Sequence, residues 1–161
     1  SYGKNELFVN TFSKYIKVLH VCGTNVTDTK YKDLCYIKDS ITYLKSRSNT
    51  PVNYTFLDDG QFVLMDGTLL IFNQDDTDKP LYLIADINGI KTKPNRLGYD
   101  VFVFQMLNEE FIPLGARGTT APYDQKCNLE AAAIIGFTCA YNAVTDSEYF
   151  KKLVRTSFIV K

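Results

Sequence analysis

Tryptophan is absent from this 161-residue sequence, and histidine occurs only once, as His20. A single imidazole leaves a serine triad or a histidine-based metal site without support. The sequence also lacks the glycine-rich phosphate loop, the dinucleotide-binding fingerprint and the nucleophile-elbow pattern. A Cys–His pair of His20 with Cys22 is disfavoured as well, because residues two apart on a helix do not face each other. The common catalytic signatures are therefore missing.

The formal net charge is zero, because 18 basic residues balance 18 acidic ones. A neutral balance provides no general attraction to nucleic acid or to anionic lipid, so we expect no nucleic-acid partner. No membrane-spanning run or signal peptide is present, yet the chain begins abruptly in a helical pattern. We interpret that start as a cut through a longer helix, whose upstream part would carry an anchor. The length of 161 residues fits one domain, residues 1–161.

The four cysteines are Cys22, Cys35, Cys127 and Cys139, one close pair near each end of the chain. Four cysteines allow three pairings, and the spacings of a zinc site built from two Cys-x-x-Cys knuckles are absent. We predict two local disulfides, Cys22–Cys35 and Cys127–Cys139, with free thiols as the alternative. Such bonds indicate an oxidising, extracytoplasmic environment.

The first quarter of the chain has a helical period. Over residues 4–21, large apolar side chains recur every three or four positions and predict an amphipathic helix with a buried stripe. The stripe consists of Phe8, Phe12, Tyr15, Ile16 and Leu19. Residues 32–47 predict a second helix, with Ile37, Ile41 and Leu44 on one face, which ends before Pro51.

The middle of the chain changes to short β-type runs separated by turn residues, and Asp-Gly turns between such runs are typical of hairpins. The expected strands are 54–57, 61–65, 68–73, 81–86 and 101–107, with a short edge segment at 111–115. Residues 129–143 fit either a short helix or a buried strand. The fold class expected is α+β, with an N-terminal helix packed on an antiparallel sheet and a disulfide-linked C-terminal region.

Two acidic segments contain carboxylates that resemble metal ligands. Asp75, Asp76 and Asp78 are dense enough to bind Ca²⁺, but an ordinary solvated loop between strands is the better interpretation. The segment "DINGIKTKPNRLGYDVFVFQ" begins like a calcium loop at Asp86. Counted from there, Lys91 occupies the place of the required glycine and Leu97 that of the bidentate glutamate, so the helix–loop–helix motif is excluded. Cationic side chains inside the segment also disfavour a cation.

A structural role explains this segment better. Asp86 and Asn88 suit an Asx-type turn that accepts backbone N–H groups. Gly89 and Gly98 allow left-handed backbone, and Pro94 restricts one turn. Asp100 is expected to cap the exit of the loop or to pair with a lysine or arginine.

The same segment resembles a motif of bacterial type IV pilin-like proteins, the minor pilins and pseudopilins whose precursors carry a prepilin-type cleavage and methylation signal. In that family, Asp-x-Asn-Gly is followed by Pro-Asn and by Gly-x-Asp-x-Phe. The matching residues are Asp86, Asn88, Gly89, Pro94, Asn95, Gly98, Asp100 and Phe102. The later "FTCAYNAVTDSEYFKKL" is similar to the family's cysteine-containing C-terminal segment, with Cys139 at the matching cysteine. Lys93 stands where the family often has glycine.

The resemblance implies a non-enzymatic structural subunit of a type IV pilus or a type II secretion-like filament, acting in assembly, adhesion or secretion. It implies no cofactor. The implied partners are other pilin or pseudopilin subunits, contacted through the N-terminal helix. The inner membrane would hold the subunit before assembly, through a preceding segment, and the head domain would face the periplasm or the cell surface.

Two other functional classes fit the residues. One is a secreted or cell-surface binding module of adhesin type. The other is a small hydrolase that uses Asp86 and Asp100 as a carboxylate pair, which requires both side chains to converge on one cleft.

Overall fold

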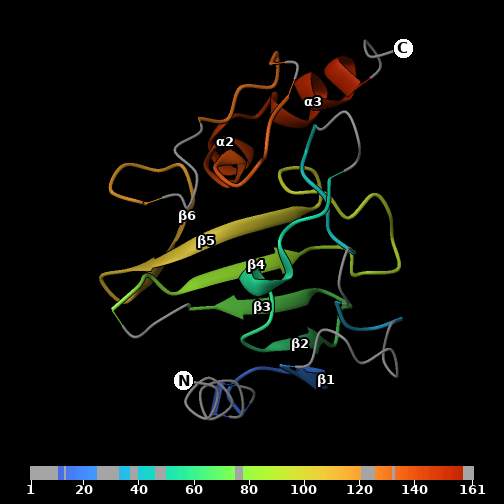
Figure 1. Ribbon diagram of the computed structural model, residues 1–161, viewed down its shortest axis with the longest axis vertical. Coiled ribbons are helices and arrows are strands. Elements are labelled where there is room, and N and C mark those ends of the chain that lie inside the picture. Colours follow the sequence, from blue (N-terminus) through green and yellow to red (C-terminus); the bar gives the residue numbers. More distant parts are fainter. Residues whose placement is uncertain are drawn as a thin grey trace.

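The computed structural model is built around one six-stranded antiparallel sheet (Figure 1), and it describes residues 11–12, 14–24, 33–36, 40–45, 50–74, 78–120, 126–131 and 133–157. Every strand pairs with its neighbour in sequence, in the order β1-β2-β3-β4-β5-β6. The strands are β1 (Val18–Gly23), β2 (Gln61–Leu64), β3 (Leu69–Asn73), β4 (Tyr82–Asp86), β5 (Val101–Leu107) and β6 (Glu110–Pro113). The sheet is therefore an antiparallel meander, as the short β-type runs separated by turn residues in the middle of the chain predict.

The turn between β2 and β3 forms where the sequence places Asp66-Gly67. Gly67 has a φ of 92°, a conformation that glycine adopts without strain, and the Asp66 carboxylate accepts a hydrogen bond from the N–H of Thr68 at 3.0 Å. A second hairpin was expected at Asp59-Gly60, between the predicted strands 54–57 and 61–65, and this prediction is wrong. Residues Tyr54–Phe56 form the 3₁₀ helix η1 instead, and the free edge of β2 is paired with β1.

Successive side chains of the strands alternate between two faces. One face, here called the inner face, carries rows such as Gln61, Ile71, Ile84 and Val103, which pair across β2 to β5 and are all buried. It is covered by η1 and its flanking chain, which cross in front of the sheet in Figure 1, and its core includes Leu57. The phenyl ring of Phe56 packs edge-on against Phe137, with centroids 4.7 Å apart.

The opposite face, here called the outer face, is also apolar. Its side chains are Phe62, Leu64, Leu70, Phe72, Leu83, Ala85, Phe102 and Phe104. Phe12 packs on Phe62 and Phe72, with centroids 5.7 Å and 5.4 Å away, so this end of the face is covered. Leu70, Leu83 and Phe104, farther across the sheet, are only half-buried.

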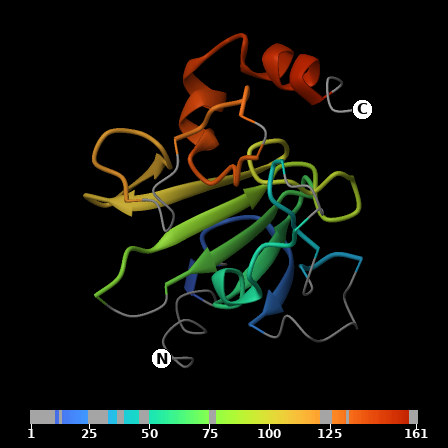
Figure 2. The same ribbon diagram turned by 45° about the horizontal axis from the view of Figure 1, so that its top comes forward.

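Two short helices close the C-terminal part, α2 (Cys139–Thr145) and α3 (Tyr149–Ser157). Figure 2 shows both above the β5 side of the sheet. They pack through Ala140, Tyr149 and Leu153 against Phe102 of β5. The segment 129–143 is thus divided, because Ile134 pairs with Lys45 as an isolated bridge and the helix starts only at Cys139. None of the helices among the described residues has the length and apolar character needed to cross a bilayer.

The N-terminal helix predicted for residues 4–21 is wrong over residues 14–21, which are not helical, whereas Thr11 and Phe12 are helical and residues 4–10 and 13 lie outside the described residues. Val18–Gly23 forms the edge strand β1, in register with β2 through Val18–Leu64 and Val21–Phe62. Tyr15 and Leu19 are 83% and 55% exposed, so the predicted stripe is not one buried face, although Phe12 and Ile16 do pack on the outer face. Phe8 lies outside the described residues. The β-branched Val18 and Val21 complete the unpaired edge of β2, and this pairing outweighs the helical period.

The second predicted helix, residues 32–47, is also wrong over its described residues 33–36 and 40–45. Thr42 pairs with Pro51 and with Arg96, and Lys45 pairs with Ile134. Ile41 and Leu44 are buried as predicted, but from an extended chain whose hydrogen bonds go to distant segments; Ile37 lies outside the described residues. The fold class is therefore corrected to a predominantly antiparallel sheet with two short C-terminal helices, instead of an N-terminal helix packed on a sheet.

Candidate functional site

The connection from β4 to β5, residues 87–100, is organised by the carboxylate of Asp100. Its Oδ2 accepts a hydrogen bond from the N–H of Asn95 at 3.0 Å, and its Oδ1 accepts one from the N–H of Arg96 at 2.6 Å. Asp100 is only 2% exposed. Two charge-assisted bonds from one side chain to the backbone fix the loop where it turns back toward β5. The sequence predicted a cap at this position.

Asp86, the last residue of β4, lies at the opposite end of the loop and next to Asp100. Its Oδ1 accepts from the N–H of Asn88 at 3.4 Å, and Asn88 Nδ2 donates to Asp100 Oδ2 at 3.5 Å. Asp86 is fully buried, and its Oδ2 has no hydrogen-bond partner among the residues that the structure describes. Burial raises the pKa of Asp86 to about 7, and the nearby negative charge of Asp100 adds to this shift.

The glycines of the loop are where other parts of the chain approach most closely. A Cβ on Gly89 would lie 2.6 Å from the carbonyl oxygen of Gly67, and one on Gly98 would lie 2.9 Å from the Cβ of Cys139. Both glycines have a φ of 75°. The loop is therefore held between the β2–β3 turn and the start of α2, and side chains are excluded at both contacts.

Asn95 connects the loop to a third segment. Its Nδ2 donates to the carbonyl oxygen of Ile90 at 2.7 Å, and its own carbonyl oxygen accepts from the N–H of Thr42 at 3.0 Å. The N–H of Leu97 donates back to the Thr42 carbonyl oxygen at 3.0 Å. The peptide bond between Lys93 and Pro94, directly before Asn95, is cis. Of the eight motif residues, six thus lie within this loop, Asp86 directly precedes it at the end of β4, and Phe102 follows it in β5.

Tyr149, the first residue of α3, also holds this loop. Its hydroxyl donates to the carbonyl oxygen of Gly98 at 2.5 Å, and burial raises the pKa of this phenol well above its ordinary value. The sequence reasoning missed Tyr149, Thr42 and Gly67, because nothing in the local spacing connects them with a loop that lies far away in sequence.

Replacing Tyr149 with phenylalanine is expected to lower the free energy of unfolding by about 1–3 kcal/mol, because the Gly98 carbonyl loses its buried donor. Urea denaturation at neutral pH measures this difference. Tyr141→Phe is the matched control, since Tyr141 is 40% exposed on α2. Equal losses in the two variants would mean that the Gly98 contact adds nothing to stability.

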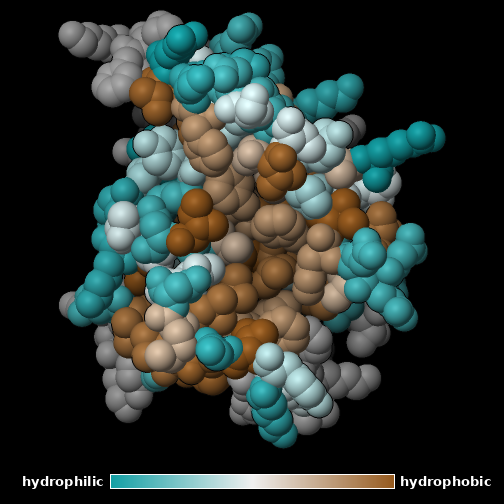
Figure 3. All heavy atoms as spheres, turned by 180° about the vertical axis from the view of Figure 1, so that it is seen from behind, coloured by the Kyte–Doolittle hydropathy of each residue, from teal (hydrophilic) through white to brown (hydrophobic). Residues whose placement is uncertain are grey.

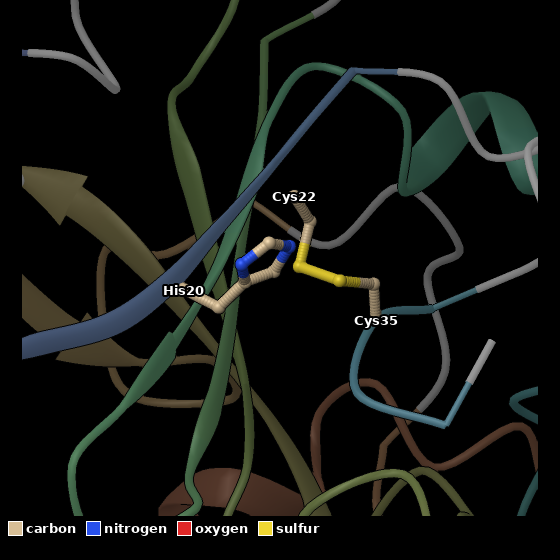
Figure 4. Close-up of side chains that lie close together, drawn as sticks. All are labelled: His20, Cys22 and Cys35. Atoms are coloured by element: carbon tan, nitrogen blue, oxygen red, sulfur yellow. A yellow bond between two sulfur atoms is a disulfide. The ribbon is translucent and has the colours of Figure 1, made fainter. Parts of the chain in front are cut away.

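Both predicted disulfides are present and confirm the local pairing. Cys22–Cys35 joins β1 to the chain that follows it, and Cys127–Cys139 joins the preceding segment to the first residue of α2. Figure 4 shows the His20 imidazole beside the Cys22–Cys35 bond; one ligand atom from each of these residues lies within 4.8 Å of the other two. Both sulfurs are used in the disulfide, so this group is neither a thiolate metal site nor a Cys–His nucleophile pair in this state.

Peptide mapping without reductant is expected to recover two linked pairs, Cys22 with Cys35 and Cys127 with Cys139. Each bond closes a loop of a size for which the chain-entropy model gives about 3 kcal/mol of stabilisation. Alkylation of all four cysteines in the folded, unreduced protein would contradict this result and with it an oxidising compartment.

Of the acidic residues considered for Ca²⁺ in the segment 73–80, Asp75 and Asp76 lie outside the described residues, and Asp78 is exposed. Near them, Asp59 Oδ2 accepts from the N–H of Gln74 at 2.6 Å, which holds the end of β3. What is described of this segment therefore fits a solvated connection between β3 and β4.

The outer face is a candidate binding surface of a different kind. Figure 3 looks onto it and shows apolar side chains gathered over a hollowed centre, with hydrophilic side chains around the margin. At the α3 side, Phe150 is 47% exposed and packs edge-on with Phe102, at 6.3 Å between centroids. Ile87 continues the β4 row beyond the strand and is 53% exposed. Contiguous apolar surface of this kind is typical of interaction sites.

Comparison of the chain with protein-family models, with curated proteins and with solved structures found no match.

Proposed function

We propose that this protein is a non-enzymatic structural subunit of an extracytoplasmic filament of the type IV pilin or pseudopilin kind. The observation that carries the proposal is the apolar outer face, on which Leu70, Leu83 and Phe104 stay half-buried. A neighbouring subunit would gain free energy by covering these side chains, at roughly 25 cal/mol for each Å² removed from water.

The loop of residues 87–100 supports a structural role over a catalytic one. Asp86 and Asp100 do converge, as the hydrolase interpretation requires, but they are 0% and 2% exposed. Both carboxylate oxygens of Asp100 accept hydrogen bonds from backbone N–H groups of its own loop. A general acid or base needs contact with its substrate, which such burial does not offer. The pair is better explained as part of the hydrogen-bonded framework that holds the β4–β5 loop.

The pilin kind of filament is favoured by the resemblance of this loop and by the two disulfides, which fit an oxidising environment outside the cytoplasm. The partners would be further copies of this subunit or related subunits. The gene would encode an apolar run of about 20 residues upstream of Ser1, preceded by a short basic leader.

The test is incorporation of the full-length gene product into filaments that are sheared from cells and sedimented. Leu83→Lys, on the outer face, is expected to lower incorporation at least about tenfold, which corresponds to 1.4 kcal/mol of lost contact energy. Leu19→Lys is the matched control, because Leu19 is 55% exposed on the edge strand β1. Normal incorporation of Leu83→Lys, in a correctly folded form, would remove the outer face as the assembly surface.

The second candidate is a secreted or cell-surface binding module, which the same outer face and the exposed Phe150 of α3 also suit. The two functions differ in what the gene encodes upstream and in what the protein joins. A cleavable signal peptide without an apolar helix, together with a protein that stays monomeric and binds a surface ligand through Leu83, would favour the module.

A further inference from the structure

We propose that Cys22 and Cys35, once their disulfide is reduced, bind one Zn²⁺ together with His20. The fourth position of the tetrahedral ion would be open to a water molecule. This inference goes beyond the proposed filament function and does not depend on it, because it concerns only the first strand of the sheet and the redox state of its cysteine.

The first argument is that β1 places His20 and Cys22 on the same face of the sheet. Side chains two positions apart in a strand point to the same side, whereas in a helix they do not face each other. His20 pairs with Val63 of the inner face, and Cys22 packs against the core of that face. Leu19 and Val21, which alternate with them, are 55% and 40% exposed. The strand therefore brings together two side chains that a helix would have separated.

The second argument is the distance between three atoms that are able to bind a metal. One imidazole nitrogen of His20 and the sulfurs of Cys22 and Cys35 all lie within 4.8 Å of one another, and Figure 4 shows the three side chains together. Around a tetrahedral Zn²⁺, with Zn–S about 2.3 Å and Zn–N about 2.0 Å, such atoms are about 3.5–3.8 Å apart. The Cα atoms of the two cysteines are 5.9 Å apart. Side-chain rotation alone is therefore enough to convert the cleaved disulfide into the metal-bound arrangement.

The third argument is that other contacts hold these residues in place without the disulfide. The Gln61 side chain of β2 accepts a hydrogen bond from the N–H of Tyr36 at 2.6 Å and donates one to the carbonyl oxygen of Tyr36 at 3.1 Å. Both residues are buried. Because Tyr36 directly follows Cys35, these bonds hold the segment of Cys35 against the sheet, while β1 is held by its own pairing with β2. Reduction therefore frees two sulfurs without releasing the segments that carry them.

The change between the two states is a balanced redox reaction. A dithiol reductant transfers two electrons and two protons to the Cys22–Cys35 bond and itself becomes a disulfide. Zn²⁺ then displaces the two thiol protons, because its ligands are two thiolates and a neutral imidazole nitrogen. Reoxidation removes both thiolates and releases the ion. His20 and Cys22 are half-buried, which leaves them within reach of the reductant and the ion. Thiolate and imidazole ligands suit Zn²⁺.

The experiment reduces the wild-type protein with a dithiol, removes the reductant under exclusion of oxygen, and adds Co²⁺ at pH 7.5. Co²⁺ takes the place of Zn²⁺ and reports its ligands through its absorption spectrum. A thiolate-to-cobalt charge-transfer band is expected to saturate at one ion per chain and to vanish when Zn²⁺ is added, and the unreduced protein should give no such band. Absence of the band in the reduced wild type, whether that protein is folded or not, would overturn the proposal.

Two variants locate the ion. Cys22→Ser keeps both thiols of Cys127 and Cys139, so it controls for binding elsewhere, and it should lose the band. His20→Gln keeps all four thiols, and its Zn²⁺ affinity should fall by more than the roughly 10–100-fold that the loss of an outer-shell partner costs. A full band in Cys22→Ser would place the ion at the other cysteine pair, and wild-type affinity in His20→Gln would remove the imidazole as a ligand. Either result contradicts the proposal.

The dependence on the fold is measured with the reduced wild-type protein in concentrated urea. The denatured chain keeps every ligand and loses their arrangement, so the Zn²⁺ concentration at half-saturation should rise at least about tenfold. Equal affinity in the native and denatured states would show that the cysteines bind Zn²⁺ without the sheet, which would also overturn the proposal.

Discussion

Replacing Asp100 with alanine is expected to lower the free energy of unfolding by about 3–5 kcal/mol, measured by urea denaturation at neutral pH. The N–H groups of Asn95 and Arg96 lose the carboxylate of Asp100 as acceptor, and a buried donor left unpaired costs about 1–3 kcal/mol. Removing the negative charge beside Asp86 offsets a part of this loss, and the missing side-chain volume adds to it.

A graded series separates the hydrogen bonds from the charge. Asp100→Asn keeps one acceptor oxygen, so it should lose about half as much stability as the alanine variant. Asp78→Ala, at an exposed position, should stay within about 0.5 kcal/mol of the wild type. If Asp100→Ala matched this control, the loop would be held by its glycine contacts and Tyr149, and the caps on Asn95 and Arg96 would contribute nothing.

The second large effect is a loss of stability as the pH rises from about 4 to about 7. Burial and the charge of Asp100 raise the pKa of Asp86 from 3.8 to about 7. Below pH 4 the carboxyl group is protonated in both the folded and the unfolded chain. Between pH 4 and pH 7 the unfolded chain ionises while the folded chain keeps its proton, so the unfolding free energy falls by about 1.4 kcal/mol per pH unit. The total is on the order of 4 kcal/mol, and the decline ends above pH 7.

Asp86→Asn is the diagnostic variant, because its side chain resembles the protonated acid and does not titrate. Its stability should be level across this window, and at pH 8 it should exceed that of the wild type. The other two aspartates with shifted pKa values, Asp66 and Asp146, do not change the stability between pH 4 and pH 7. Hydrogen bonds lower the pKa of both groups, so the stability that they contribute is lost only as the pH falls below about 4. A wild-type profile without the decline would mean that Asp86 is ionised and compensated in the folded protein.

The loop of residues 87–100 shows how far local residue chemistry extends. Asx turns, left-handed glycines and the cap by Asp100 are local events, and the spacing of these residues predicts them. The meeting of Asp86 with Asp100 is not local, because it needs β4 and β5 to pair in register. The hydrogen bond from Tyr149 to Gly98 and the approach of Gly89 to Gly67 depend on segments that fold back from elsewhere.

By itself, the sequence determined the strands from β2 to β5, the Asp66-Gly67 turn, the two disulfide pairings and the loop chemistry, because period, turn residues and close cysteine spacing act over short distances. Only the tertiary structure decided that Val18–Gly23 is a strand, since its apolar residues fit a helical stripe and the deciding partner is the edge of β2. The same holds for Thr42 and Lys45, which bond to distant segments. Successive side chains of a strand point to opposite faces, and nearly all of those in these strands are apolar, so both faces of this sheet are apolar. The sequence therefore does not say which face the rest of the chain covers. The packing of η1 and its neighbours on the inner face settled that, and it left the centre of the outer face half-buried.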